Sequence, residues 1–188
     1  MQKTREEIKR SCLKLLEEKP LSQITVKAIV EDCGINRNSF YYHYADIPTL
    51  LSDIVLESAD QIILAHPDMA SLEECLNTVT QFAREHKRAM LHVFKSADRA
   101  LYERSLAKVC HDVVASYCRT VFGEVDADEE DQELMIRFYQ CELMGQILLW
   151  LESDMQYDIQ RQYSRLLELR EGFAPEMMRR IVLRKGRK

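Results

Sequence analysis

The chain has 188 residues, of which 46% are apolar and 30% charged, so it can form one large domain or a small one joined to a medium one. It contains no apolar run of about 18 residues, and Met1–Arg5 does not open a signal-peptide core. These features exclude membrane-spanning and secreted classes and predict a cytoplasmic protein with no membrane partner. Six scattered cysteines without a CxxC pair favour reduced, buried thiols over a disulfide scaffold.

The net charge of −5 is unevenly distributed along the sequence. Residues 1–44 carry +2, residues 45–173 carry −12, and residues 174–188 carry +5. Because phosphate is anionic, the acidic middle is a poor partner for nucleic acid and the two ends are better ones. Nucleic-acid binding is therefore predicted in the N-terminal segment. The basic tail Arg184–Lys188 is predicted to be disordered and solvated, or else to make a non-specific DNA contact.

The spacing of apolar residues predicts helices throughout, and no strand pattern competes with them. A first helix is expected over about residues 4–18, followed by a connector at 19–22. Asp46 can cap a fourth helix that carries Pro48 in its first turn, where a missing N–H costs little. This helix is expected to end near residues 66–67.

Later helix boundaries follow from caps and glycines. Ser71 and Glu74 have capping-box spacing and open a fifth helix, while Gly123 and Gly172 are expected to end two others. The remaining helices are predicted over about residues 86–95, 98–122, 128–153 and 156–171, with a last basic segment from residue 175. The acidic run 124–133 is interpreted as a solvated surface rather than a metal site. The predicted fold is all-α, with about nine or ten helices.

Residues 25–44 are predicted to form two short helices joined by a tight turn. Thr25 is a plausible N-cap, the apolar residues 26, 29 and 30 share one helical face, and Gly34 can adopt the positive φ that reverses the chain. The second helix carries a polar surface that a soluble core could not use, whereas the aromatic residues Phe40 and Tyr44, at four-residue spacing, are expected to pack into the small core. This pattern is typical of a helix-turn-helix, whose second helix lies in the DNA major groove.

Residues 4–50 resemble the DNA-binding domain of the TetR/AcrR family of transcriptional regulators. The matching features are Thr4–Ile8, Ile24–Val26, Ile29 with Gly34–Ile35, Phe40–Tyr44 and Leu50. The run Gly145–Leu151 is similar to a motif of the penultimate helix in some members. The resemblance implies a helix-turn-helix domain at residues 1–46 and a helical effector-binding and dimerisation domain at residues 47–188. Pro20 stands where the family often has Gly, which should stiffen the connector without altering DNA recognition.

The resemblance implies specific roles on double-stranded, palindromic operator DNA. The predicted base contacts are Asn36, Arg37, Asn38, Ser39, Tyr42 and His43. The predicted backbone contacts are Thr25, Lys27 and Tyr41. Side-chain chemistry agrees, because Arg can form two hydrogen bonds to guanine and Asn to adenine. Ile47 and Pro48 replace a phosphate-contacting Lys of many members, which predicts weaker DNA affinity.

The family also pairs its last long helices into a homodimer, which the two half-sites of a palindrome require. The predicted interface consists of Gly145, Ile147, Leu148 and Leu151. The alternative is that these residues only close the core of the monomer.

A small-molecule effector is the second partner that the resemblance implies. Its predicted pocket is lined by His92, Phe94, Tyr102, His111, Tyr117, Tyr139 and Glu142, although these could equally be ordinary core or surface residues. Cys110 and Cys118 lie about 12 Å apart on one helix face, too far for one tetrahedral metal site. No metal and no cofactor are expected, and the six thiols leave a redox switch as a minor alternative.

The predicted function is a repressor that an effector releases from DNA. The alternatives are an activator of the same family, a helical enzyme and a protein-interaction module. The sequence lacks a Gly-rich phosphate loop, GxSxG and HExxH, which argues against the enzyme.

Overall fold

The computed structural model describes residues 2–65, 71–97, 99–122 and 128–185. Over these ranges the chain forms ten α-helices and one short 3-10 turn, with no strand, as predicted. The helices are α1 (Gln2–Glu18), α2 (Val26–Cys33), α3 (Arg37–His43), α4 (Ile47–Ala65), α5 (Leu72–Glu85), α6 (Lys87–Phe94), α7 (Arg99–Phe122), α8 (Glu129–Glu152), α9 (Ile159–Leu169) and α10 (Phe173–Lys185).

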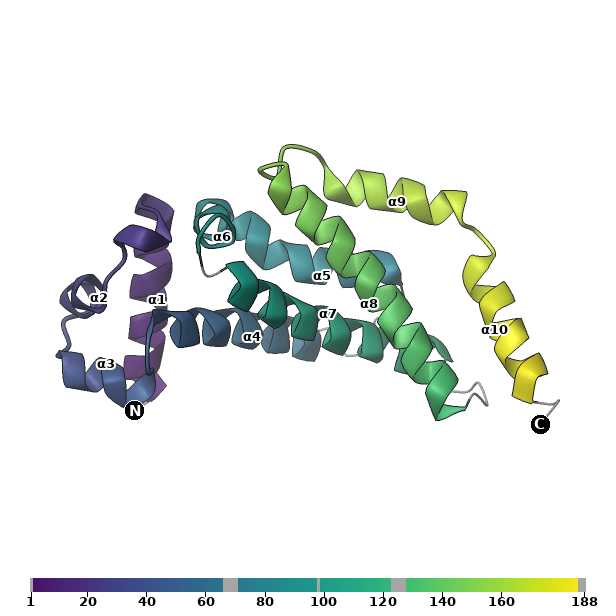
Figure 1. Cartoon of the computed structure of the whole chain (residues 1–188), viewed down its shortest axis with the longest axis horizontal. Helices are drawn as coiled ribbons and strands as arrows, with labels where there is room; N and C mark the ends of the chain where they lie inside the picture. The colour runs from purple at the N-terminus through teal and green to yellow at the C-terminus, as the bar shows by residue number, and fades with distance from the viewer. Residues whose placement is uncertain (1, 66–70, 98, 123–127, 186–188) are drawn as a thin grey trace. The chain divides into compact units, whose positions relative to one another are not determined.

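The helices belong to two compact units (Figure 1). The N-terminal unit contains Met1–Gln61 and Gln81–Leu106, and the C-terminal unit contains Ile62–Thr80 and Ala107–Lys188. Helices α4, α5 and α7 each run from one unit into the other. The domain boundary expected at residue 46 stays a prediction.

The core of the N-terminal unit is built from the apolar faces of α1, α2, α3 and α4. Ile8, Leu16, Ile29, Phe40 and Leu50 are fully buried there, each at 0% exposure. Removing such side chains from water is the main force that holds these four helices together. Helix α6 joins this core, because the ring N–H of His92 donates to the carbonyl of Leu16 over 2.7 Å.

Local capping sets most helix ends. The capping box at the start of α5 is confirmed: Ser71 Oγ accepts from the backbone N–H of Glu74 at 3.1 Å, and Glu74 accepts from that of Ser71 at 3.3 Å. The ninth helix, expected from about residue 156, begins only at Ile159. The carboxylate of Asp158 accepts from the backbone N–H of Arg161 at 3.0 Å and so acts as its N-cap.

The core of the C-terminal unit includes one face of α8 and the start of α9. Tyr139, Leu143 and Tyr163 are at most 1% exposed. The indole N–H of Trp150 donates to the carbonyl of Tyr157 at 3.0 Å, which holds the turn between the two helices. These contacts orient the rest of α8 with its opposite face outward.

The chain end differs from its prediction. Arg184 was expected in a disordered tail, but it lies in α10 and its guanidinium binds the carboxylate of Asp131 at 3.0 Å. Asp131 was assigned to a solvated acidic run, yet it is only 8% exposed. Residues 124–127 of the acidic run, residues 186–188 of the tail, and Gly123, where a helix was expected to end, lie outside the described residues.

Candidate nucleic-acid interface

The turn between α2 and α3 has the geometry that a helix-turn-helix requires. Gly34 has φ 71°, and the backbone N–H of Ile35 donates to the carbonyl of Val30 at 3.0 Å. A left-handed residue that closes a helix in this way is a C-cap for which glycine carries no steric penalty. At the other end of α2, Thr25 Oγ1 accepts from the N–H of Ala28 at 3.1 Å, as predicted.

Helix α3 separates a buried face from an exposed one. Phe40 is 0% exposed and Tyr44 4%, whereas Tyr41 is 55% and Tyr42 69% exposed. From the sequence, the first pair is expected in the core and the second pair on DNA. Burial of the first pair is confirmed, while the DNA contacts remain predictions.

The polar residues of α3 divide into two groups. Arg37 and Asn38 are exposed at its first turn. Asn36 is the N-cap, and its Oδ1 accepts from the backbone N–H of Ser39 at 2.8 Å and from its hydroxyl at 3.1 Å. An asparagine needs both its acceptor and its donor to hold adenine bidentately. The capping bond therefore favours Arg37 and Asn38 over Asn36 as base readers.

The predicted backbone contacts lie on exposed positions of the same unit. Thr25 and Lys27 stand at the start of α2, and Tyr41 lies on α3. The ammonium of Lys27 is 3.7 Å from the carboxylate of Glu31, and both side chains are about two-thirds exposed. Such an exposed pair is weak, so Lys27 can exchange it for a phosphate.

A cluster of charged side chains, which is not predicted from the sequence, joins α1, the end of α3 and α4. This charge cluster consists of Arg5 and Lys9 of α1, Tyr44, and Asp53 and Glu57 of α4. The carboxylate of Asp53 accepts a hydrogen bond from the Tyr44 hydroxyl at 2.7 Å and another from Arg5 Nη2 at 2.5 Å. It also forms an ion pair with Lys9 Nζ at 3.0 Å. Lys9, whose side chain is 7% exposed, also pairs with Glu57.

The cluster changes the acidity of its members. Partial burial raises the pKa of Asp53, but the hydrogen bonds from Arg5, Tyr44 and Lys9 outweigh it and leave that pKa below its ordinary value. Burial, helped by the hydrogen bond to Asp53, raises the pKa of Tyr44. The one signal in the sequence is the spacing of four residues within each like-charged pair, which places both members on one helix face.

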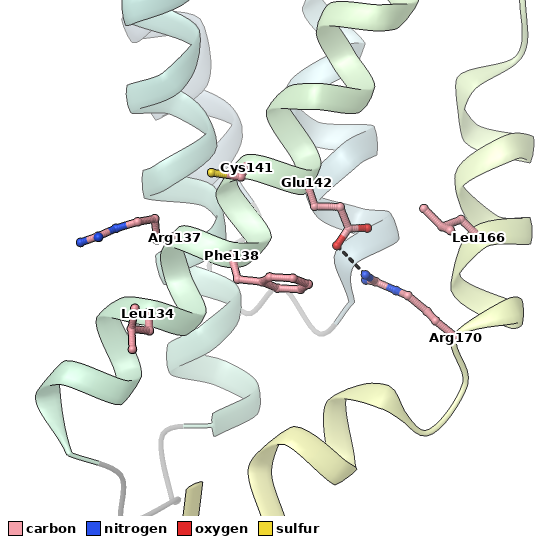
Figure 2. Close-up of a pocket in the computed structure, with 7 residues that line it drawn as sticks. All are labelled: Leu134, Arg137, Phe138, Cys141, Glu142, Leu166 and Arg170. Atoms are coloured by element: carbon pink, nitrogen blue, oxygen red, sulfur yellow. Dashed lines mark hydrogen bonds and ion pairs between the residues drawn. The ribbon is translucent and has the colours of Figure 1, made fainter. Parts of the chain in front are cut away.

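A cleft of about 680 Å³ lies beside α8 in the C-terminal unit (Figure 2). It is lined by Leu134, Arg137, Phe138, Cys141, Glu142, Leu166 and Arg170. Glu142 and Arg170 point toward each other, and Arg170 Nη1 donates to Glu142 Oε2 at 2.5 Å with side chains only 14% and 20% exposed. The guanidinium of Arg170 also lies over the ring of Tyr139, 5.7 Å from its centroid.

The seven predicted effector residues fall into separate groups. Phe94 and Tyr102 pack edge to face in the N-terminal unit, with centroids 6.4 Å apart, while His92 is bound to α1. In the C-terminal unit, Tyr117 and Tyr139 pack edge to face at 5.9 Å.

The other two effector candidates of the C-terminal unit have charged partners. Glu142 binds Arg170, as described above. His111 is half-buried, and its ring nitrogen lies 3.3 Å from the carboxylate of Asp112. An effector pocket formed by these residues stays a prediction.

The predicted dimer residues also divide by face. Ile147 and Leu151 are 2% and 0% exposed within a single chain, which favours the alternative that they close the monomer core. Gly145 and Leu148 are half-buried on the other side of α8, and Leu149 beside them is 59% exposed. Involvement of the outward pair in a dimer remains a prediction.

The residues that the structure describes contain no group of three His, Cys, Asp or Glu side chains that could hold a metal ion. None of the described helices is long and apolar enough to cross a membrane.

Comparison with known proteins places the chain in a family. A TetR-type family model described as "Transcriptional regulator C-terminal region" matches residues 70–172, more than half of the chain. No curated protein sequence matches. Several solved structures do.

The dihydroxyacetone kinase operon activator DhaS is similar with a TM-score of 0.69 and 15% identity, over 96% of this chain and 97% of that one. A TetR transcriptional regulator from Rhodococcus sp. RHA1 is similar with a TM-score of 0.58 and 13% identity, over 91% and 97%. NalD of Pseudomonas aeruginosa, the secondary repressor of the MexAB-OprM multidrug efflux pump, gives 0.56 and 18%, over 89% and 95%. At these identities the likeness supports the fold, whereas the family match shows that the chain belongs to the TetR family of DNA-binding transcriptional regulators.

Proposed function

We propose that this regulator is a cytoplasmic homodimer that represses transcription by occupying a palindromic operator, and that a small-molecule effector releases it. The observation that carries the proposal is α3, whose exposed face is held in place by the buried Phe40 and Tyr44 and by the Gly34 turn. Repression needs only occupancy of a promoter, whereas activation also needs a surface for the transcription machinery. We therefore favour repression over activation. Neither role requires catalysis, and we propose that the protein has no enzymatic activity of its own.

Base recognition is assigned to Arg37 and Asn38, supported by Tyr42 and His43 further along the exposed face of α3. Arg37 can donate two hydrogen bonds to guanine O6 and N7, and Asn38 can hold adenine N6 and N7. Asn36 and Ser39 are engaged with each other at the N-cap. Their contribution to sequence preference is therefore expected to be smaller.

Phosphate contacts are assigned to Thr25, Lys27 and Tyr41, which fix the position of the DNA-binding domain on the duplex. We assign the DNA-binding domain to residues 1–46, and effector binding and dimerisation to residues 47–188.

The dimer surface that the geometry supports is the outer face of α8. Its residues are separated by three or four positions and lie opposite the buried face: Leu134, Phe138, Cys141, Gly145 and Leu148. Leu134 and Phe138 are 48% and 44% exposed, which leaves apolar area to be covered by a second copy. At Gly145 no atom of the described residues lies within 4 Å of an added Cβ, which leaves room for a close helix crossing.

An effector site is proposed at Tyr117, Tyr139 and Glu142 in the C-terminal unit. Among the residues that the structure describes, the buried hydroxyl of Tyr139 has no hydrogen-bond partner. Buried polar atoms of this kind are costly unless something binds them, so they are suitable contacts for a polar ligand.

Activation is the second candidate function. It is favoured by the similarity to DhaS, which is named an operon activator. A reporter fused to the bound promoter separates the two, because loss of a repressor raises expression and loss of an activator lowers it.

The test of DNA recognition is selection of a binding site from random duplex DNA, followed by footprinting of the selected fragment. Replacing Arg37 by Ala should cost about 1–3 kcal/mol on that fragment and relax the preferred base. The matched control is Arg88→Ala, which removes an exposed arginine from α6 of the same unit. Selection of no preferred sequence, or an Arg37→Ala footprint identical to that of the wild type, would contradict the proposal.

A further inference from the structure

The charge cluster contains no residue assigned to DNA contact, but one of its members, Tyr44, lies at the end of α3. Tyr44 is the C-cap residue of α3, and its backbone N–H donates to the carbonyl of Phe40 at 2.9 Å. Its hydroxyl donates to Asp53 Oδ2 at 2.7 Å and accepts from Arg5 Nε at 3.3 Å. The end of the recognition helix is thus bound to α4 and to α1 through one hydroxyl group.

Apolar packing alone would leave α3 less well oriented. Phe40 and Tyr44 anchor it in the core with ring centroids 6.0 Å apart, but hydrophobic burial is non-directional. A hydrogen bond weakens steeply as its angle departs from linearity, so the Tyr44–Asp53 bond limits rotation of α3 about its own axis.

Asp53 is held in position by residues other than Tyr44. Arg5 donates to both of its carboxylate oxygens, at 2.5 and 3.2 Å, and Lys9 lies 3.0 Å away. The side chain of Lys9 is 7% exposed and also pairs with Glu57, one turn further along α4. A carboxylate held by two cationic side chains through three contacts has little freedom to follow a moving hydroxyl.

We propose that Tyr44 and Asp53 are positioning residues for sequence readout, because their hydrogen bond sets the rotation of α3 and hence the direction of Arg37 and Asn38. The inference rests on the proposed base-reading role of those two residues. Bidentate contacts to base edges tolerate little misalignment, whereas contacts of flexible cations to phosphate tolerate much more. Loss of the bond should therefore weaken specific binding and leave non-specific binding intact.

The decisive variant is Tyr44→Phe in the full-length protein, because it removes the hydroxyl and keeps the buried ring. The probes are the duplex selected by the wild-type protein and a scrambled duplex of the same composition. We expect affinity for the selected duplex to fall about tenfold, equivalent to about 1.4 kcal/mol, and affinity for the scrambled duplex to be unchanged. The control is Tyr163→Phe, which removes a buried hydroxyl from the C-terminal unit and should change neither affinity.

A double-mutant cycle tests whether Tyr44 acts through Asp53. In an Asp53→Asn background, Tyr44→Phe should cause less than half of the loss it causes alone, because the charged acceptor is gone. Circular dichroism of each variant confirms that the helices are retained.

Three results would overturn the inference: unchanged specific affinity of Tyr44→Phe, equal losses on the selected and scrambled duplexes, or a full additional loss in the Asp53→Asn background. A wild-type protein that binds both duplexes equally would instead refute the proposed function. The two failures are therefore distinguishable.

Discussion

Replacing Lys9 by Met tests whether the charge cluster stabilises the N-terminal unit. Methionine has a similar length and no charge, so the change removes the ion pairs with Asp53 and Glu57 and keeps the packing. At an effective dielectric constant of about 20, one pair at 3.0 Å is worth about 5 kcal/mol in direct attraction. Because the variant does not have to bury an ammonium group, it avoids a desolvation cost of several kcal/mol, and this offsets part of the lost attraction. Because Arg5 and Tyr44 still bind Asp53, we expect a net loss of about 2–3 kcal/mol in the free energy of unfolding.

The assay is urea unfolding followed by far-ultraviolet circular dichroism. Lys14→Met is the matched control on the same helix, because Lys14 also binds a carboxylate, that of Asp32, at 2.5 Å. Its side chain is 59% exposed, so water and salt screen that pair and its loss should change the midpoint very little.

A second variant separates the charge from the packing. In Lys9→Met combined with Glu57→Leu, no carboxylate is left without its close cation, and stability should recover most of the way to wild type. Equal effects of Lys9→Met and Lys14→Met would refute the reasoning, as would a double variant less stable than Lys9→Met alone.

Two other predictions concern the N-cap and the dimer. Asn36→Ala should lower the free energy of unfolding by about 1 kcal/mol through loss of the N-cap, measured in urea, while the selected DNA sequence stays the same. Leu148→Glu should convert the dimer to a monomer in analytical ultracentrifugation, because it places a charge on the outer face of α8. Cys141 on that face should react faster with a thiol reagent in this variant than in wild type, and equal rates would count against the interface.

The helix-turn-helix could be predicted from the sequence because its signals are local. Thr25 bonds three residues ahead, and Gly34 supplies a left-handed turn. The capping box of Ser71 and Glu74 at the start of α5 is equally local. Each of these features depends on residues at most a few positions apart. Their chemistry is therefore visible before any tertiary contact is known.

The charge cluster and the outward face of α8 could not be predicted for opposite reasons. Asp53 meets Arg5 across 48 residues and Tyr44 across 9, and no local pattern specifies that pairing. Helix α8 instead carries too many apolar residues: Ile147 is buried and Leu148 faces outward, yet both fit an apolar helical repeat. Periodicity cannot distinguish a core face from a partner face when both are apolar.

The cluster also limits how this acidic chain can hold DNA. The N-terminal 44 residues contain eight Lys and Arg, but Arg5, Lys9 and Lys14 bind carboxylates of their own unit. Arg37 is assigned to a base, and Ile47 replaces a lysine common in the family. At most four cationic side chains in the DNA-binding domain of each subunit are then left to neutralise phosphate.

Binding to the selected operator should therefore depend weakly on salt. If two of the four cations in each subunit reach phosphate, a dimer neutralises about four, and log K should fall with log salt with a slope of about −4. Fluorescence anisotropy over a range of salt concentrations measures this slope. A slope of about −7 or steeper would require all eight available cations of the dimer, and the cluster could then not be withholding charge from DNA. A shallow slope means that affinity comes from base contacts and from dimerisation, and the base contacts depend on how firmly α3 is held in its orientation.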